Sequence, residues 1–214
     1  MKKIILTVAA VFALTFANAQ DTKEATSGGM GFSNGDLYLT GKAGFDSTKD
    51  FQDDDSGDFF KKNDGFELSP GLGYMISDNL AIEGQLTFAS RTKENATTGT
   101  ETKDTGFGIA AGVKYYFTPA SQFSLSIGGN VSYMSTKEEV TTSLGTGSGT
   151  AKEIGFNVPL GMNYFVSNDW ALTATWGGFG YSSNDNGGGS APKTTGFNLG
   201  LDLSSLSFGL LYKL

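Results

Sequence analysis

Residues 65–74 read GFELSPGLGY, and the same pattern returns without a gap at 106–115 (GFGIAAGVKY) and at 155–164 (GFNVPLGMNY). Gly196-Phe197 and the segment 209–212 (GLLY) repeat its two ends. Counted from the phenylalanine, every second residue is mostly bulky and apolar, whereas the residues between are mostly small or polar. A period of two is typical of β-strands, because successive side chains point to opposite faces. Each copy is therefore predicted to be a strand whose bulky face carries an aromatic residue at both ends.

Eight strands of this kind can be read along the chain. We predict them at residues 36–45, 65–76, 80–90, 106–117, 123–136, 153–166, 170–181 and 195–214. The connections alternate strictly between three short turns (77–79, 118–122, 167–169) and four long loops (46–64, 91–105, 137–152, 182–194). Tight turns on one side and long loops on the other are typical of outer-membrane barrels. The sequence therefore predicts an all-β fold, an eight-stranded antiparallel up-and-down transmembrane β-barrel with short periplasmic turns and long extracellular loops.

The composition of the two strand faces decides which solvent lies outside the barrel. The face opposite the bulky one carries mainly glycine, serine, alanine, threonine and asparagine. A water-soluble barrel would point its bulky face inward and would need a charged outer coat, which this small and uncharged face does not provide. Small side chains do suit the narrow lumen of eight strands. We therefore predict that the bulky face lies in lipid.

Aromatic residues mark both edges of the bulky face. The loop-end ring is predicted to contain Phe45, Phe66, Phe88, Phe107, Tyr133, Phe156, Trp176 and Phe197. The turn-end ring is predicted to contain Tyr74, Tyr115, Phe117, Phe123, Tyr164, Trp170 and Tyr212. Two aromatic belts around one apolar band match the girdles of outer-membrane barrels. A soluble β-sandwich, the alternative, seldom has aromatic residues in register at both strand ends.

Two irregularities interrupt this pattern. Pro70 and Pro159 fall within strands, where they cannot donate to the ladder, so we expect local bulges there. The last segment changes parity at Ser204-Ser205, which is either a bulge or a two-residue turn. We favour the bulge, because a turn would give nine strands and would place the C-terminus on the wrong side.

The N-terminus has the three parts of a secretory signal peptide. Lys2 and Lys3 precede an uncharged apolar run at 4–16, which is followed by Ala17-Asn18-Ala19. The run is too short to cross a bilayer, which takes about 20 residues. We therefore divide the chain into a cleaved signal peptide (1–19), a short N-terminal segment (20–35) and a barrel domain (36–214).

Charge and cysteine content exclude several classes of protein. The net charge of −7 makes the chain a poor ligand for nucleic acid, which requires clustered lysine and arginine. No cysteine is present, so there is no disulfide framework and no lipoprotein anchor. The 31 glycines have no Gly-X-Y period, which excludes collagen.

From the signal peptide to the C-terminal segment 209–214 (GLLYKL), the chain resembles small outer-membrane β-barrel proteins of Gram-negative bacteria, the OmpA/OmpX-like and porin-family group. The resemblance implies export to the outer membrane and contact with its lipid and lipopolysaccharide. It also implies insertion by the barrel assembly machinery, which reads a C-terminal signal similar to Leu206, Phe208, Leu210, Tyr212 and Leu214. The family usually ends in phenylalanine, whereas this chain ends in Leu214. We expect a monomer without a cofactor.

Candidate residues for chemistry are few. The chain has no histidine, which removes Ser–His and Cys–His nucleophiles, and barrel enzymes of similar fold rely on one. We therefore expect no enzyme. Gly106, Gly108 and Ala111 match a dinucleotide fingerprint only formally, because no helix follows them. The acidic segment 53–58 (DDDSGD) is interpreted as a solvated loop, with weak Ca²⁺ binding left open.

Four charged residues interrupt the small face, namely Lys42, Glu67, Glu83 and Lys114. Lys42 and Glu67 are predicted near the loop end of adjacent strands, and Glu83 and Lys114 near the turn end. Charges inside a narrow barrel must be paired or hydrogen-bonded. We expect two lumenal ion pairs, Lys42–Glu67 and Glu83–Lys114, with simple hydration of each charge as the alternative.

Three functions fit these features. The first is a structural or surface-interaction role through the extracellular loops, the second a small passive diffusion channel, and the third a soluble secreted barrel that binds an apolar ligand. Loops rich in threonine, serine, glycine and aspartate do not identify an external partner.

Overall fold

The computed structural model describes residues 29–54, 57–95, 98–188, 191–200 and 206–214, and between residues 50 and 61 it describes the backbone alone. The predicted signal peptide and Ser204-Ser205 lie outside the described residues. In the described part of the chain, no helix has the length and apolar character needed to cross a membrane.

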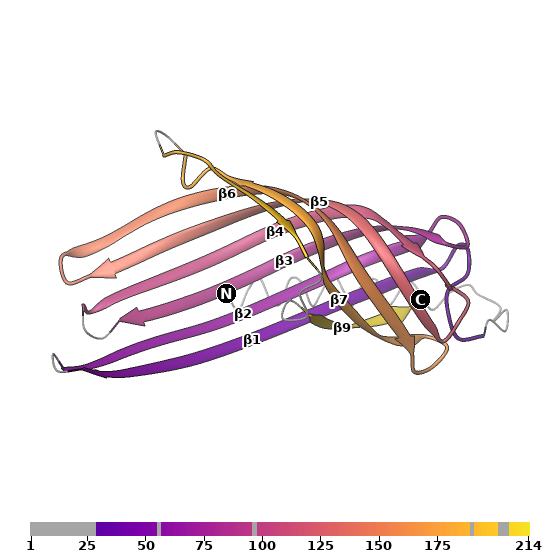
Figure 1. Cartoon of the computed structure of the whole chain (residues 1–214), viewed down its shortest axis with the longest axis horizontal. Helices are drawn as coiled ribbons and strands as arrows, with labels where there is room; N and C mark the ends of the chain where they lie inside the picture. The colour runs from indigo at the N-terminus through magenta and orange to yellow at the C-terminus, as the bar shows by residue number, and fades with distance from the viewer. Residues whose placement is uncertain (1–28, 55–56, 96–97, 189–190, 201–205) are drawn as a thin grey trace.

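The described chain folds into one closed antiparallel sheet (Figure 1). Its strands are β1 (Leu37–Asp54), β2 (Gly57–Met75), β3 (Leu80–Asn95), β4 (Thr100–Tyr116), β5 (Phe123–Thr142), β6 (Gly145–Phe165), β7 (Trp170–Asn184), β8 (Thr194–Leu199) and β9 (Ser207–Lys213). Each strand from β1 to β7 pairs with the next. Both β8 and β9 pair antiparallel with β7, and β9 also pairs with β1, which closes the barrel.

The strands β8 and β9 are two halves of the eighth barrel strand. They lie along successive parts of β7 and run in the same direction, so β9 continues the direction of β8 rather than turning back beside it. The predicted eight-stranded antiparallel barrel is confirmed.

The apolar face points outward, as predicted. Large apolar side chains between the two aromatic rings are solvent-accessible on the isolated barrel, among them Leu72, Ile82, Leu86, Ile109, Val113, Val131, Leu172 and Leu210. A band of this kind is stable only against hydrocarbon or another apolar surface. The alternative of a soluble barrel with an inward apolar face is therefore wrong.

The two mid-strand prolines are accommodated differently. At Pro159, β7 is shifted against β6, because Gly177 and Gly178 stand opposite the single proline, as expected for a bulge. At Pro70, pairing with β3 skips two positions and resumes in the same register, so the bulge predicted there is wrong. At Pro70 the β2–β3 ladder alone is interrupted, because the N–H that proline lacks would have pointed toward β3.

Three of the predicted long loops are extended hairpins rather than loops. The pairing of β1 with β2 continues to Asp54–Gly57, that of β3 with β4 to Asn95–Thr100, and that of β5 with β6 to Thr142–Gly145. Neighbouring hairpins are also paired through β2–β3 and β4–β5. The six strands form one sheet that projects beyond the loop-end ring, on the left in Figure 1. The structure therefore has a paired, polar sheet where the sequence predicted loops.

A compact core fills the turn end of the barrel. It contains Phe32, Tyr38, Met75, Ala81, Tyr116, Phe165, Ala171 and Leu211, each no more than 1% exposed. Phe32 precedes β1 and inserts its ring among those of Tyr38, Tyr116 and Phe165, with centroid distances of 4.7–5.0 Å. The N-terminal segment thus forms a plug, which we define as residues 29–36.

Backbone and side-chain contacts hold the plug in place. The Phe32 N–H donates to the Pro119 carbonyl at 2.7 Å. Gly31 lies against Pro119 at a φ of 126°, where a side chain would collide with backbone atoms. The Lys213 Nζ donates to the Gly31 carbonyl at 2.9 Å and lies 3.6 Å from the Asp36 carboxylate. Lys213 on the last strand therefore holds in place the plug that precedes the first strand.

Candidate functional site

The lumen above the plug begins with a buried charge cluster. The Lys114 Nζ on β4 lies 2.7 Å from the Glu83 Oε1 on β3. The Tyr38 hydroxyl donates to the same carboxylate oxygen at 2.7 Å and lies 3.2 Å from the Tyr116 hydroxyl. The structure thus brings together Glu83 and Lys114, the two residues expected to pair near the turn end.

Alternation of side chains explains how the sequence builds this cluster. Tyr38 follows the exposed Leu37 in the alternation of β1 and is fully buried, so its side chain points inward. Its register partner on β2 is Gly73, and a Cβ at Gly73 would collide with the Tyr38 ring. The glycine therefore makes room for a tyrosine that crosses the narrow lumen. Tyr38, Tyr116 and Phe32 were not identified from the sequence as buried residues of the turn end. For Tyr38, its inward position in the alternating pattern of the strand could have indicated it.

The second expected pair does not form in the described part of the chain. Glu67 accepts a hydrogen bond from the Ser69 hydroxyl at 3.1 Å, and this hydroxyl also lies 3.2 Å from that of Thr87. Lys42 faces Ser69 in the β1–β2 register, whereas Glu67 faces Gly44. Lys42 and Glu67 are therefore diagonal neighbours rather than direct register partners. The Lys42–Glu67 ion pair expected from the sequence is not formed.

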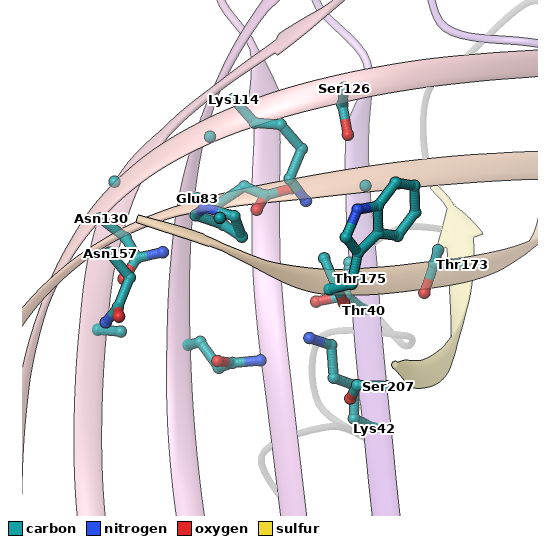
Figure 2. Close-up of a pocket in the computed structure, with 18 of the residues that line it drawn as sticks. Thr40, Lys42, Glu83, Lys114, Ser126, Asn130, Asn157, Thr173, Thr175 and Ser207 are labelled. Atoms are coloured by element: carbon teal, nitrogen blue, oxygen red, sulfur yellow. The ribbon is translucent and has the colours of Figure 1, made fainter. Parts of the chain in front are cut away.

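Two cavities occupy the lumen above the charge cluster. The lower cavity has a volume of about 350 Å³, and its wall includes the Glu83–Lys114 pair, Lys42, Thr175 and side-chain amides (Figure 2). The upper cavity, of about 570 Å³, is lined by Glu67, Arg91 and Asp104 at the loop end. Lys42 and Ser207 line both cavities, so the polar lumen continues from the buried cluster to the loop end.

The aromatic rings lie largely as predicted. In the loop-end ring, Phe45, Phe66, Phe107, Tyr133, Phe156 and Phe197 are exposed on the outer surface and Phe88 is half-buried, with its ring 5.4 Å from that of Phe107. In the turn-end ring, Tyr74, Tyr115, Phe117, Phe123, Tyr164 and Trp170 are exposed, and Tyr212 is half-buried, 4.8 Å from Trp170.

Trp176 in the loop-end ring is half-buried and borders the lower cavity beside the bulge at Gly177 and Gly178. It precedes the bulge and pairs with Leu160, so it keeps the parity of the outward-facing Leu172. Beyond the bulge the parity of β7 changes, and Phe179 lies beside Phe156 and Phe197, with ring centroids 6.0 Å and 5.2 Å away. Phe179 is therefore a member of the loop-end ring that was not identified from the sequence.

Charges on the projecting sheet form ion pairs that are accessible to solvent. The Arg91 guanidinium lies 3.4 Å from the Asp46 carboxylate, and the Lys93 Nζ lies 3.7 Å from the Asp104 carboxylate. The side chains of the acidic segment 53–58 lie outside the described residues. Among the described residues there is no group of three or more carboxylates, histidines or cysteines that could hold a metal ion.

Asp185 joins the last loop to the projecting sheet. Its carboxylate accepts the Lys152 N–H at 2.7 Å and the Gly187 N–H at 3.2 Å. The hydrogen bond from the Lys152 backbone lowers the pKa of Asp185 below its ordinary value. This contact fixes the upper end of β6 where its pairing with β7 stops.

Comparison with known proteins places this architecture in a family. The model of the outer membrane protein beta-barrel domain matches residues 5–204. No curated protein matches the chain. The structure is similar to OprG, an outer membrane protein of Pseudomonas aeruginosa, with 15% identity, 86% of this chain and 98% of that chain covered, and a TM-score of 0.51. It is also similar to Ail, the attachment invasion locus protein of Yersinia pestis, with 13% identity, 85% and 99% coverage, and a TM-score of 0.50.

Identities this low show a shared fold and no more. The family and these two structures are outer-membrane barrels and not enzymes. The family assignment, the outward apolar band and the two aromatic rings agree on an outer-membrane location. This chain belongs to the family of outer membrane protein β-barrel domains.

Proposed function

We propose that this barrel is a surface-interaction protein whose projecting sheet contacts molecules outside the cell. The observation that carries the proposal is the continuation of β1–β6 past the loop-end ring. From Tyr133 to the end of β5 at Thr142 the strand has nine further residues, which extend about 30 Å. A paired sheet of this length holds its side chains in fixed positions, which favours recognition over free loops.

The β5–β6 hairpin has two features suited to binding. Leu144 at its tip is 97% exposed, and an exposed leucine can anchor a partner in an apolar pocket. The β6 residues 145–151 (GTGSGTA) pair with β5 on one side, while pairing with β7 begins only at Glu153–Asn184. This uncharged strand therefore presents an open edge, to which an extended peptide can add as another strand.

The plugged turn end is evidence against the channel, the second function considered. Phe32 and its three aromatic neighbours fill the lumen at that end, and eight-stranded barrels generally enclose packed side chains. We expect the purified protein in planar bilayers to give no stable openings, and Phe32→Ala to give measurable ion current. Stable openings of the unmodified protein would favour the channel.

Orientation can be tested by labelling, because the chain has no native cysteine. Thr146→Cys at the projecting sheet should react with a membrane-impermeant maleimide on intact cells. Asp78→Cys in the short β2–β3 turn should react only after the outer membrane is permeabilised. The opposite pattern would place the sheet in the periplasm and end the proposal.

The proposed role can be tested by trimming one hairpin. Lys137 and Thr150 are register partners, so an Asn-Gly turn can join them in place of residues 138–149. Cells that display the full chain should adhere to a panel of protein-coated surfaces more strongly than cells that display the trimmed chain. Leu144→Ser is the milder variant, with an intermediate loss.

Slower gel migration after boiling reports whether each variant folds, and only folded variants are compared. Equal adhesion of the full and trimmed chains, or no adhesion above that of cells without the protein, would contradict a surface-interaction role.

A further inference from the structure

Lys42 brings a positive charge into the barrel and forms no ion pair with a carboxylate of the described residues. The lumenal carboxylate of Glu83 is taken by Lys114 at 2.7 Å, and Asp46 at the loop end lies 3.4 Å from Arg91. Glu67 is held by the Ser69 hydroxyl instead of by Lys42. An ammonium group in a narrow, partly desolvated lumen attracts an anion more strongly than one on an open surface.

The cavity that Lys42 enters is lined in part by hydrogen-bonding groups. Figure 2 shows its side chain reaching into the lower cavity, which Thr40, Thr173 and Thr175 also line. The Thr175 hydroxyl oxygen is buried and has no hydrogen-bond partner in the described part of the chain. A buried hydroxyl without a partner is costly, and a bound polar group would relieve that cost.

The charges that line the lower cavity determine the sign of the ligand. Lys42, Lys114 and Glu83 are the charged residues of its wall, and the last two neutralise each other. One positive charge is left, which favours an anion over a cation or a neutral solute. The volume of about 350 Å³ is at the lower end of small-molecule sites, so it suits a small oxyanion rather than a lipid.

We infer that the lower cavity is a binding site for a small oxyanion, such as a phosphate or a short carboxylate. Lys42 supplies the charge, and the threonine hydroxyls around it supply hydrogen bonds. The ligand enters from outside the cell through the upper cavity, because Lys42 lines both cavities while the plug closes the other end. This site is separate from the projecting sheet and goes beyond the proposed surface role.

The site can be tested by isothermal titration calorimetry with inorganic phosphate. The full protein is refolded in an uncharged maltoside detergent, and sodium chloride keeps the ionic strength constant. We expect saturable binding that is weakened at least about tenfold by Lys42→Met, the loss expected for one charge-assisted hydrogen bond. Lys42→Arg should retain binding, and Lys93→Met on the projecting sheet should leave it unchanged.

Two further variants keep the test decisive. Glu67→Gln removes a carboxylate that competes for the Lys42 ammonium, so phosphate should bind more tightly. Thr175→Val leaves every charge in place and should weaken phosphate binding. If Lys42→Met does not show the gel shift of a folded barrel, Thr175→Val serves as the test of the site. No saturable binding by the unmodified protein, or equal affinity after Lys42→Met, would overturn the site.

Discussion

The two ends of the barrel are built from opposite kinds of residue. The turn end packs seven buried side chains around Phe32 and holds a buried ion pair, whereas the projecting sheet at the loop end is exposed and polar. Buried aromatic packing contributes far more stability than solvated strand pairs do. The comparison indicates that the turn end carries the stability of the fold and leaves the loop end free for recognition.

The strongest test of this difference compares two ion pairs. Lys114→Met leaves the buried Glu83 carboxylate without its ion-pair partner, and we expect the free energy of unfolding to fall by about 4 kcal/mol. Arg91→Met breaks the half-exposed pair with Asp46 and should cost less than about 1 kcal/mol. Urea unfolding in phospholipid vesicles, followed by tryptophan fluorescence, measures both. The double variant Glu83→Gln/Lys114→Met should recover most of the lost free energy of unfolding. If the double variant is no more stable than Lys114→Met, the loss does not come from leaving the Glu83 charge unpaired.

Phe32→Ala tests the plug against the hairpin tip. Removing a ring packed against three others should lower the free energy of unfolding by about 3 kcal/mol. Leu144→Ala at the exposed tip should change it by less than about 0.5 kcal/mol. The same unfolding experiment compares them, and equal effects would show that the plug is not part of the cooperative core.

Two glycines test packing at the two ends. A Cβ at Gly73 would collide with the Tyr38 ring, so Gly73→Ala should destabilise the barrel by about 2 kcal/mol through overpacking. Nothing lies within 4 Å of a Cβ at Gly147, and Gly147→Ala should be neutral within about 0.5 kcal/mol. Thermal unfolding in detergent is sufficient here, and a neutral Gly73→Ala would mean that Tyr38 has room to move.

The smallest effect is a pH response confined to the loop end. The pKa of Asp185 is lowered in the folded protein by the hydrogen bond from the Lys152 backbone. A lowered folded pKa contributes stability above the unfolded pKa, and this contribution is lost as the pH falls through the folded pKa. The amide resonance of Lys152 should therefore shift in strongly acidic solution, below the usual range of an aspartate. Asp185→Asn should abolish that shift, and its persistence would assign the titration to another group.

Much of the membrane-spanning barrel could be predicted because lipid imposes a pattern. Alternation of bulky and small residues gave the strand number, the three short turns and most of both aromatic rings. The pattern failed where lipid is absent. Above the loop-end ring both strand faces meet water, so residues such as 145–151 (GTGSGTA) carry no apolar alternation and were assigned to loops.

Side-chain details inside the barrel were less predictable. Phe179 was left out of the loop-end ring because a bulge of two glycines opposite Pro159 changes the parity of β7 beyond Trp176. The Lys42–Glu67 pair was expected from strand position alone, but hydrogen bonding by Ser69 and a diagonal register keep the two charges apart. Phe32 was missed because it precedes the first strand, and periodicity says nothing about a residue outside the periodic segments.

The contact between Lys213 and Gly31 joins the last strand to the segment before the first. Nearby, the Leu214 N–H donates to the Leu37 carbonyl, so the seam of the cylinder links residues almost 180 positions apart. Pairings so distant in sequence form slowly, since a long stretch of chain must be ordered before they can be made. We therefore expect docking of the plug and closure of the seam to occur together, late in the folding of the barrel.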